Sequence, residues 1–192
     1  MHAYELYLPV TAPRLALLAA AFLTLAACSP TFNWREVRPD NTGLSLLLPC
    51  KPDRAERTVP LGGQPVALRM LGCDAGGATF AVAVADIVDA SKAEAVLAQW
   101  QALMLANMKA GPVGLVAGAT QVSSFRPPGM ATGAPALLVK AQGQRADGQA
   151  VAGQAAYFAR GSQLFQVVLY ADVMSAEVAE TFFSSLKFEP AA

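Results

Sequence analysis

Few side chains in this 192-residue sequence are of a type that could carry out chemistry. The only histidine is His2, so Ser–His and Cys–His nucleophilic pairs and histidine-ligated metals are not expected in the body of the chain. Two carboxylates, Asp86 and Asp89, follow an alternating apolar segment and could supply oxygen ligands to a hard cation or a carboxylate pair for hydrolysis. The alternative, which we favour, is that both are solvated residues at a strand-to-helix junction. We therefore expect no catalytic residue, no metal and no cofactor.

The first 27 residues have the pattern of a secretory signal peptide. Arg14 is followed by an apolar run over 15–27, with small residues just before Cys28. A positive flank, an apolar core and a small-residue cleavage site in this order are typical of such a signal. The run is 13 residues long, whereas a membrane-spanning helix needs about 20. We expect residues 1–27, with His2 among them, to be removed during export.

The tetrad Leu25-Ala26-Ala27-Cys28 resembles the lipobox of bacterial lipoproteins. The resemblance implies that Cys28 becomes the N-terminus and carries lipid on its thiol, with residues 28–32 as a tether. Because Ser29 rather than Asp follows the cysteine, the resemblance also implies sorting to the outer membrane. The sequence thus predicts a protein held on the periplasmic side of the bacterial envelope, with the membrane as its partner through Cys28. An ordinary secretory signal followed by a chance cysteine is the alternative.

Once Cys28 is assigned to the lipid, two cysteines remain, Cys50 and Cys73. In an oxidising compartment an even pair of this kind favours a disulfide, which in the chain-entropy model would stabilise the fold by about 3 kcal/mol. A redox or metal pair is the alternative, but the spacing is far from Cys-x-x-Cys and no histidine stands near. We interpret the pair as a structural disulfide.

Residues 33–189 should form a single soluble domain. Removal of the signal takes away Arg14 and Glu5 and leaves cations and anions balanced, so we expect no nucleic acid partner. About 160 residues are enough to bury the core of one domain. No second apolar run approaches the length needed to span a membrane.

Alternating apolar positions and turn residues predict a series of strands. Gly62-Gly63 favours a tight hairpin, and the segment 164–171, apolar on both faces, favours a central strand. The charged segment 51–57 is expected to be a solvated loop, with an anion site as the alternative. The expected strands are 33–38, 44–48, 58–61, 65–73, 78–88, 120–126, 136–145, 151–160 and 164–171.

Two helices complete the expected elements. Ser91-Lys92-Ala93-Glu94 reads as a capping box at the start of a helix that runs to about Lys109. Ser175 can cap a closing helix. Apolar stripes should bury one face of each helix. The stripe of the first helix is Val96, Trp100, Leu103 and Met104, flanked by Leu97 and Met108, and that of the second is Val178, Phe182 and Leu186.

Consecutive strands with tight turns, one long helix and one short helix indicate an α+β fold with an antiparallel sheet. The order of elements, Leu46-Leu47-Leu48-Pro49 at the end of an early strand and the closing segment 181–188 (TFFSSLKF) are similar to the PsbP-like superfamily, and within it to DcrB-type envelope lipoproteins. The resemblance implies a curved antiparallel sheet flanked by helices and a role as a binding or assembly factor. It assigns no functional residue.

Two classes of function follow. The first is a lipid-anchored binding or assembly module with an envelope protein as partner, and the second is a small-ligand or cation carrier, or a hydrolase, that uses Asp86 and Asp89.

A candidate surface for binding a partner is the segment 126–135. It is too rich in Pro and Gly to be a strand and should form an exposed loop in which Arg126, Pro127, Pro128 and Met130 could make contacts. A passive connection between strands is the alternative.

Overall fold

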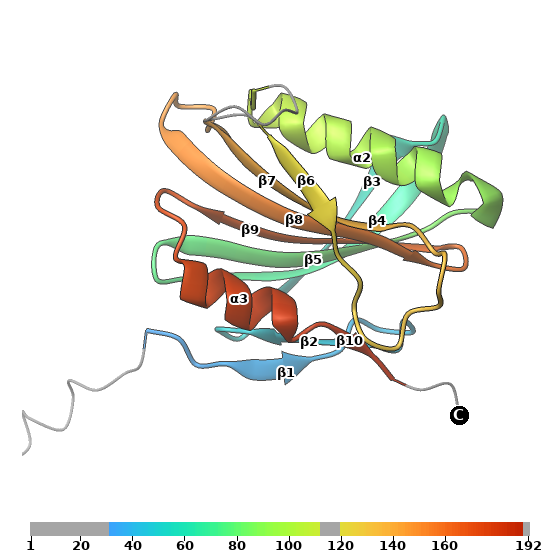
Figure 1. Cartoon of the computed structure of the whole chain (residues 1–192), viewed down its shortest axis with the longest axis horizontal. Coiled ribbons are helices and arrows are strands. Elements are labelled where there is room, and N and C mark those ends of the chain that lie inside the picture. Colours follow the sequence, from blue (N-terminus) through green and yellow to red (C-terminus); the bar gives the residue numbers. More distant parts are fainter. Residues whose placement is uncertain (1–30, 112–119, 190–192) are drawn as a thin grey trace, which may run out of the picture. The chain divides into compact units, whose positions relative to one another are not determined.

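The computed structural model describes residues 31–111 and 120–189. These residues form an α+β fold with two antiparallel sheets and two α-helices (Figure 1). None of the helices in the two described ranges is both long and apolar enough to cross a bilayer. The elements are β1 (Arg35–Val37), β2 (Leu44–Leu48), β3 (Asp53–Leu61), β4 (Gln64–Ala75), β5 (Ala78–Asp86), the 3-10 turn η1 (Ala90–Lys92), α2 (Ala93–Asn107), β6 (Gln121–Ser124), β7 (Ala136–Gln144), β8 (Ala150–Arg160), β9 (Gln163–Ala171), α3 (Ala176–Ser184) and β10 (Lys187–Phe188).

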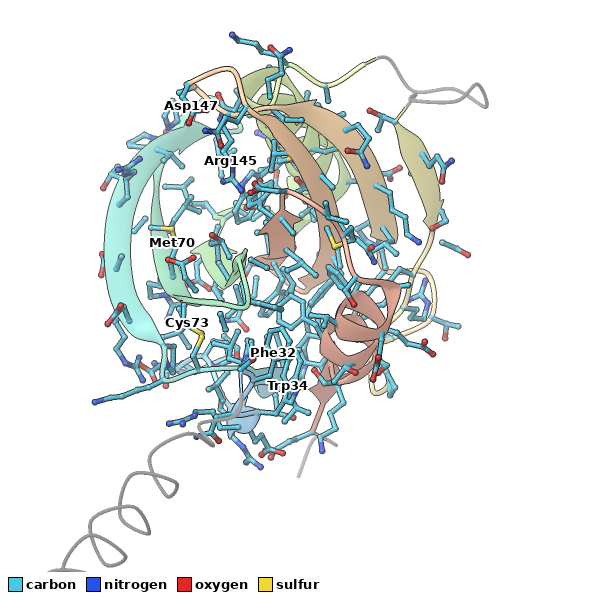
Figure 2. All side chains as sticks on the ribbon, turned by 90° about the vertical axis from the view of Figure 1, so that its left-hand side faces the viewer. Phe32, Trp34, Met70, Cys73, Arg145 and Asp147 are labelled. Carbon is cyan, nitrogen blue, oxygen red and sulfur yellow. A yellow bond between two sulfur atoms is a disulfide. The ribbon has the colours of Figure 1, made fainter. Side chains whose placement is uncertain are left out.

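A seven-stranded sheet in the order β3-β4-β5-β9-β8-β7-β6 forms the middle layer. Helix α2 covers one face, whereas α3 and the three-stranded sheet β1-β2-β10 cover the other (Figure 1). Viewed from one end, the large sheet is strongly curved, with β3 and β4 on one side and β6, β7 and β8 on the other (Figure 2). The prediction of an antiparallel sheet is confirmed, but the early strand 44–48 belongs to a second sheet, because β2 pairs with β1 and β10 only.

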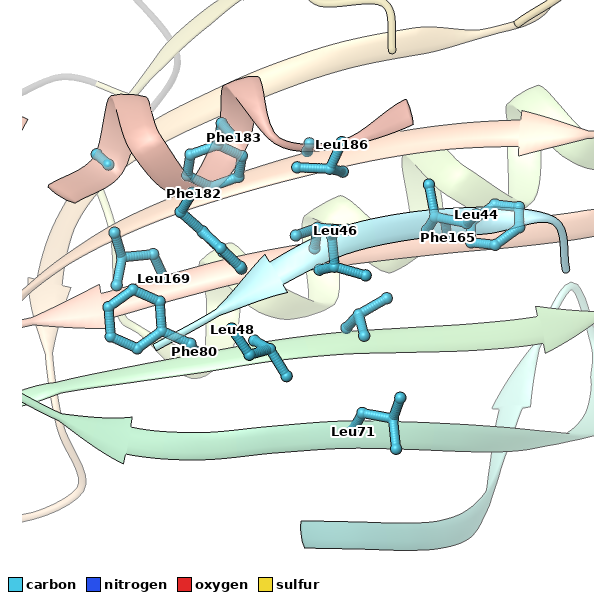
Figure 3. Packing of buried hydrophobic residues seen from close by; sticks show 14 of the residues in the cluster. Leu44, Leu46, Leu48, Leu71, Phe80, Phe165, Leu169, Phe182, Phe183 and Leu186 are labelled. Carbon is cyan, nitrogen blue, oxygen red and sulfur yellow. The ribbon is translucent and has the colours of Figure 1, made fainter. Parts of the chain in front are cut away.

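The layer between the large sheet and α3 has an aromatic and leucine core. Leu44, Leu46 and Leu48 of β2 are at most 1% exposed and belong to one cluster, in which Leu48 lies near Phe80 of β5 and Leu44 near Phe165 of β9 (Figure 3). Phe32 stacks on Trp34 at 5.8 Å between ring centroids (Figure 2). Both rings lie edge-on to Phe80. The compact domain therefore includes Phe32, which the sequence analysis placed in the tether.

On the opposite face, α2 packs on a surface of small side chains. Ala83 and Ala85 of β5 and Ala155 and Ala159 of β8 are buried beneath the helix, as the alanine-rich alternation of residues 78–88 would allow. The buried residues of α2 and its end include Ala93, Val96, Leu97, Trp100, Met104 and Met108. Leu103 is 43% exposed, so its place in the predicted stripe is wrong. Adjacent positions point about 100° apart on a helix, and Met104 takes the position that faces the sheet.

The start of α2 also differs from the expected capping box. Asp89, not Ser91, is the capping residue: its carboxylate accepts the backbone N–H of Ser91 at 3.0 Å and the hydroxyl of Ser91 at 2.6 Å. The chain therefore enters the helix through a 3-10 turn, and Lys92 at the α2 boundary makes no side-chain cap. The cap of α3 is confirmed, because the Ser175 hydroxyl accepts the N–H of Val178 at 3.3 Å.

The charged segment 51–57 is solvent-exposed as predicted, but the prediction of a loop is wrong for residues 53–57. From Asp53 onward it is the first half of β3, an edge strand that pairs with β4 from Asp53 to Leu61. Residues 53–58 are all exposed, so no apolar alternation marks the strand. Charged side chains on an edge strand discourage pairing with other chains.

Candidate functional site

Cys28 and the predicted signal 1–27 lie outside the described residues. Cys50 and Cys73 form the predicted disulfide, with Cα atoms 6.0 Å apart. Cys50 follows β2 of the small sheet and Cys73 belongs to β4 of the large sheet. The bond therefore ties the two sheets together, in agreement with a structural role.

Asp86 and Asp89 each serve a separate structural partner. The carboxylate of Asp86 accepts the Arg69 guanidinium at 2.5 Å and the Gln163 amide at 3.1 Å, whereas Asp89 caps η1. The hydrogen bonds from Ser91 hold the pKa of Asp89 below its usual value, with Lys92 adding a smaller effect. Among the described residues, no group of three His, Cys, Asp or Glu could hold a metal ion. The interpretation of these carboxylates as a cation or hydrolytic site gains no support from this geometry.

The Pro- and Gly-rich loop 126–135 is anchored to the domain. The Arg126 guanidinium donates to two carbonyl groups of the loop itself, at 2.6 and 3.1 Å, and the N–H of Phe188 donates to the Pro128 carbonyl at 2.8 Å. Pro127 is buried and Met130 is half-buried against the aromatic core, whereas Arg126 and Pro128 are exposed. Met130 is therefore a packing residue rather than a free apolar contact. Partner binding by this loop stays a prediction.

A polar groove of about 570 Å³ lies between α3 and the strands β6, β7 and β8. We call it the glutamine groove, because three of its lining side chains are glutamines. Its floor carries Gln121, Lys140, Gln142 and Gln154, and its wall carries Met174, Ala176, Ala179 and Glu180, with Ala141, Ala152 and Gly153 completing the lining.

The register of the sheet places the polar side chains of the floor in a row. Gln121 of β6 is opposite Lys140 of β7, and Lys140 is opposite Gln154 of β8. Directly opposite residues of antiparallel strands project from the same face. Amide, ammonium and amide therefore follow one another across three adjacent strands, from the sheet edge toward α3.

Gln154 is the unusual residue of this row. It is 7% exposed and lies in a strand whose residues 151–159 are all buried, yet its side chain makes no hydrogen bond to any residue in the described part of the chain. By contrast, the amide of Gln166 on the neighbouring strand donates to the Tyr157 hydroxyl at 2.8 Å. Among the described residues, the one fully sealed side-chain N or O atom without a partner is Ser45 Oγ, so the polar end of Gln154 keeps contact with water through the groove. The Gln154 amide is available to a molecule in the groove.

The small residues of α3 leave room above this amide. Ala176 and Ala179, in the first turns of the helix, line the groove, whereas Phe182 and Phe183 in its second half fill the aromatic core. The side chains of the groove offer hydrogen bonds, one cation and one carboxylate, but no thiol, hydroxyl or imidazole.

Sequence analysis missed this site. The signal that was present is Gln154 itself, a lone amide in the apolar run 150–159. Comparison with protein-family models and with curated proteins finds no match for the chain. The geometry of the groove is therefore the feature that points to a ligand.

Proposed function

We propose that this protein is a non-catalytic, lipid-anchored binding module of the bacterial envelope that holds a small polar ligand in the glutamine groove. The observation that carries the binding role is the unpartnered amide of Gln154 at the floor of the groove. An amide that makes no hydrogen bond within the described fold and lines a groove is free to bind a ligand there. The volume of about 570 Å³ is within the range of small-molecule sites.

The anchor and the compartment rest on sequence features. The tetrad that ends in Cys28 is similar to a lipobox, and a disulfide fits an oxidising compartment such as the periplasm. Lipid on Cys28 would hold the domain at the periplasmic side of the membrane, with the outer membrane as the expected destination. An envelope protein is the second expected partner. Cross-linking in native membranes would identify it, with the exposed Arg126 and Pro128 as the first positions to probe.

The anchor is tested with the Cys28→Ala variant of the full-length precursor. Lipidation predicts that the wild type is found in the membrane fraction with a lipid-bearing N-terminal peptide in mass spectrometry, and that the variant loses both. An unmodified wild-type peptide, cut by an ordinary signal peptidase, would refute the anchor and leave the groove untouched.

The groove is tested with the intact protein in detergent and three probes, trialanine, glucose and inorganic phosphate, each at millimolar concentration. Binding in the groove predicts that at least one probe shifts the side-chain amide resonances of Gln154 and Gln142 while that of Gln166 stays unchanged. Gln166 is the control because it donates to Tyr157, a member of the cluster beneath α2, on the other face of the sheet. If no probe moves the groove amides, the binding role is refuted.

A further inference from the structure

The glutamine groove carries two opposite charges that do not pair with each other. Lys140 is on β7, at the centre of the floor, and Glu180 is on α3, in the wall. Seven salt bridges join other charged residues of the described chain, and neither Lys140 nor Glu180 takes part in one there. A ligand that carries both a negative and a positive group would complement this arrangement.

The spacing of the strands suits a short extended chain. Adjacent strands are about 4.8 Å apart, so the amide of Gln154 on β8 lies one strand from Lys140 on β7. An extended peptide advances by about 3.4 Å per residue, so a chain of a few residues that begins at Lys140 passes the Gln154 amide on its way to α3. Each glutamine amide both donates and accepts, and a peptide group offers the matching acceptor and donor.

Other classes of small ligand fit the lining less well. It contains no aromatic ring on which a sugar or a nucleobase could stack. A phosphate would meet a single lysine, whose field is opposed by Glu180, and no arginine fork. One cation and one carboxylate instead favour a ligand whose net charge is near zero.

We propose that the glutamine groove binds a short peptide with free termini, its carboxylate toward Lys140 and its ammonium toward Glu180. This inference rests on the proposed binding role of the groove. The amides of Gln154 and Gln142 would then hydrogen-bond the peptide groups between the two termini.

The test compares trialanine with its N-acetylated and its C-amidated forms, by calorimetric titration of the intact protein in detergent. Each modification removes one terminal charge and should weaken binding to the wild type about two- to fivefold, the range of partly exposed ion pairs. Lys140→Gln should abolish the preference for the free carboxylate but keep that for the free amine. Glu180→Gln should do the reverse. Lys51→Gln and Glu94→Gln, exposed residues outside the groove, should leave both preferences unchanged.

The outcomes separate this inference from the function on which it rests. If the modified peptides bind as tightly as trialanine, or if glucose or phosphate moves the groove amides and trialanine does not, the peptide assignment is overturned while the groove remains a binding site. If none of the probes moves these amides, both proposals fail.

Discussion

Replacing Gln154 by Met should make the protein more stable and destroy ligand binding. Methionine is close to glutamine in length and shape and has no strong hydrogen-bonding group, so the exchange removes the unpartnered amide with little change in packing. Gln154 is 7% exposed, which places most of the side chain away from water.

The expected gain in stability is at most about 1 kcal/mol. A fully sealed, unpaired amide costs about 1–3 kcal/mol, and the penalty is smaller here because the polar atoms of Gln154 keep contact with water through the groove. For a domain of this size, 1 kcal/mol corresponds to a rise in melting temperature of about 2–4 °C. Thermal denaturation followed by circular dichroism, with the disulfide intact, resolves a shift of this size.

Gln166→Met is the matched control for this exchange. Gln166 is on the adjacent strand β9 and its amide donates to the hydroxyl of Tyr157, which is 0% exposed. Loss of the Gln166 amide leaves the Tyr157 hydroxyl buried without its partner. The free energy of unfolding should therefore fall by about 1–2 kcal/mol, and the melting temperature should fall with it. If Gln154→Met lowers the melting temperature as Gln166→Met does, the amide of Gln154 has a structural partner and the basis of the proposed function is lost.

Three further changes test the fold. Gly129→Ala should destabilise the fold by about 2 kcal/mol or more, because φ is +82° and the added Cβ would lie 2.5 Å from a backbone oxygen of β10. Gly133→Ala, at φ +86° with open space around it, should cost less. Equal melting temperatures for the two variants would refute the close contact at Gly129. Reduction of the disulfide should cost about 3 kcal/mol in chemical denaturation, and thiols that react with alkylating agents before reduction would disprove the bond. Burial raises the pKa of Tyr170 to about 12, so the stability that its neutral phenol contributes is complete below about pH 10 and is lost as the pH rises toward 12. Tyr170→Phe should lose less stability over that range in urea titrations, and identical losses would contradict the burial of the phenol.

The parts of the fold that follow from local sequence patterns were predictable. Gly62-Gly63 joins β3 to β4 with both glycines at positive φ, as a tight hairpin turn requires, and the two-sided apolar segment 164–171 lies in β9 between β5 and β8. The disulfide followed from the even number of remaining cysteines. The residues that determine the hairpin and the central strand are neighbours in sequence, and two remaining cysteines allow only one disulfide pairing.

The parts that were missed depend on distant pairing or on exposure. The first half of β3 has solvent on both faces, so no apolar alternation distinguished it from a loop. Lys187 and Phe188 form β10 only because they pair with Ser45 and Leu44 of β2, more than a hundred residues away. The predicted closing helix took no account of that pairing.

The glutamine groove lies beyond sequence reasoning for the same reason. Gln121, Lys140 and Gln154 come from three strands, and only the register of the sheet places them in one row. The groove then exists because the wall of α3 changes from alanine to phenylalanine along nine residues: Phe182 and Phe183 close the core, whereas Ala176 and Ala179 do not reach across to the floor. A larger residue near the start of α3 would have covered Gln154 and left its amide sealed without a partner. The small residues of the wall and the unpaired amide of the floor thus depend on each other, and a bound ligand is what would satisfy both.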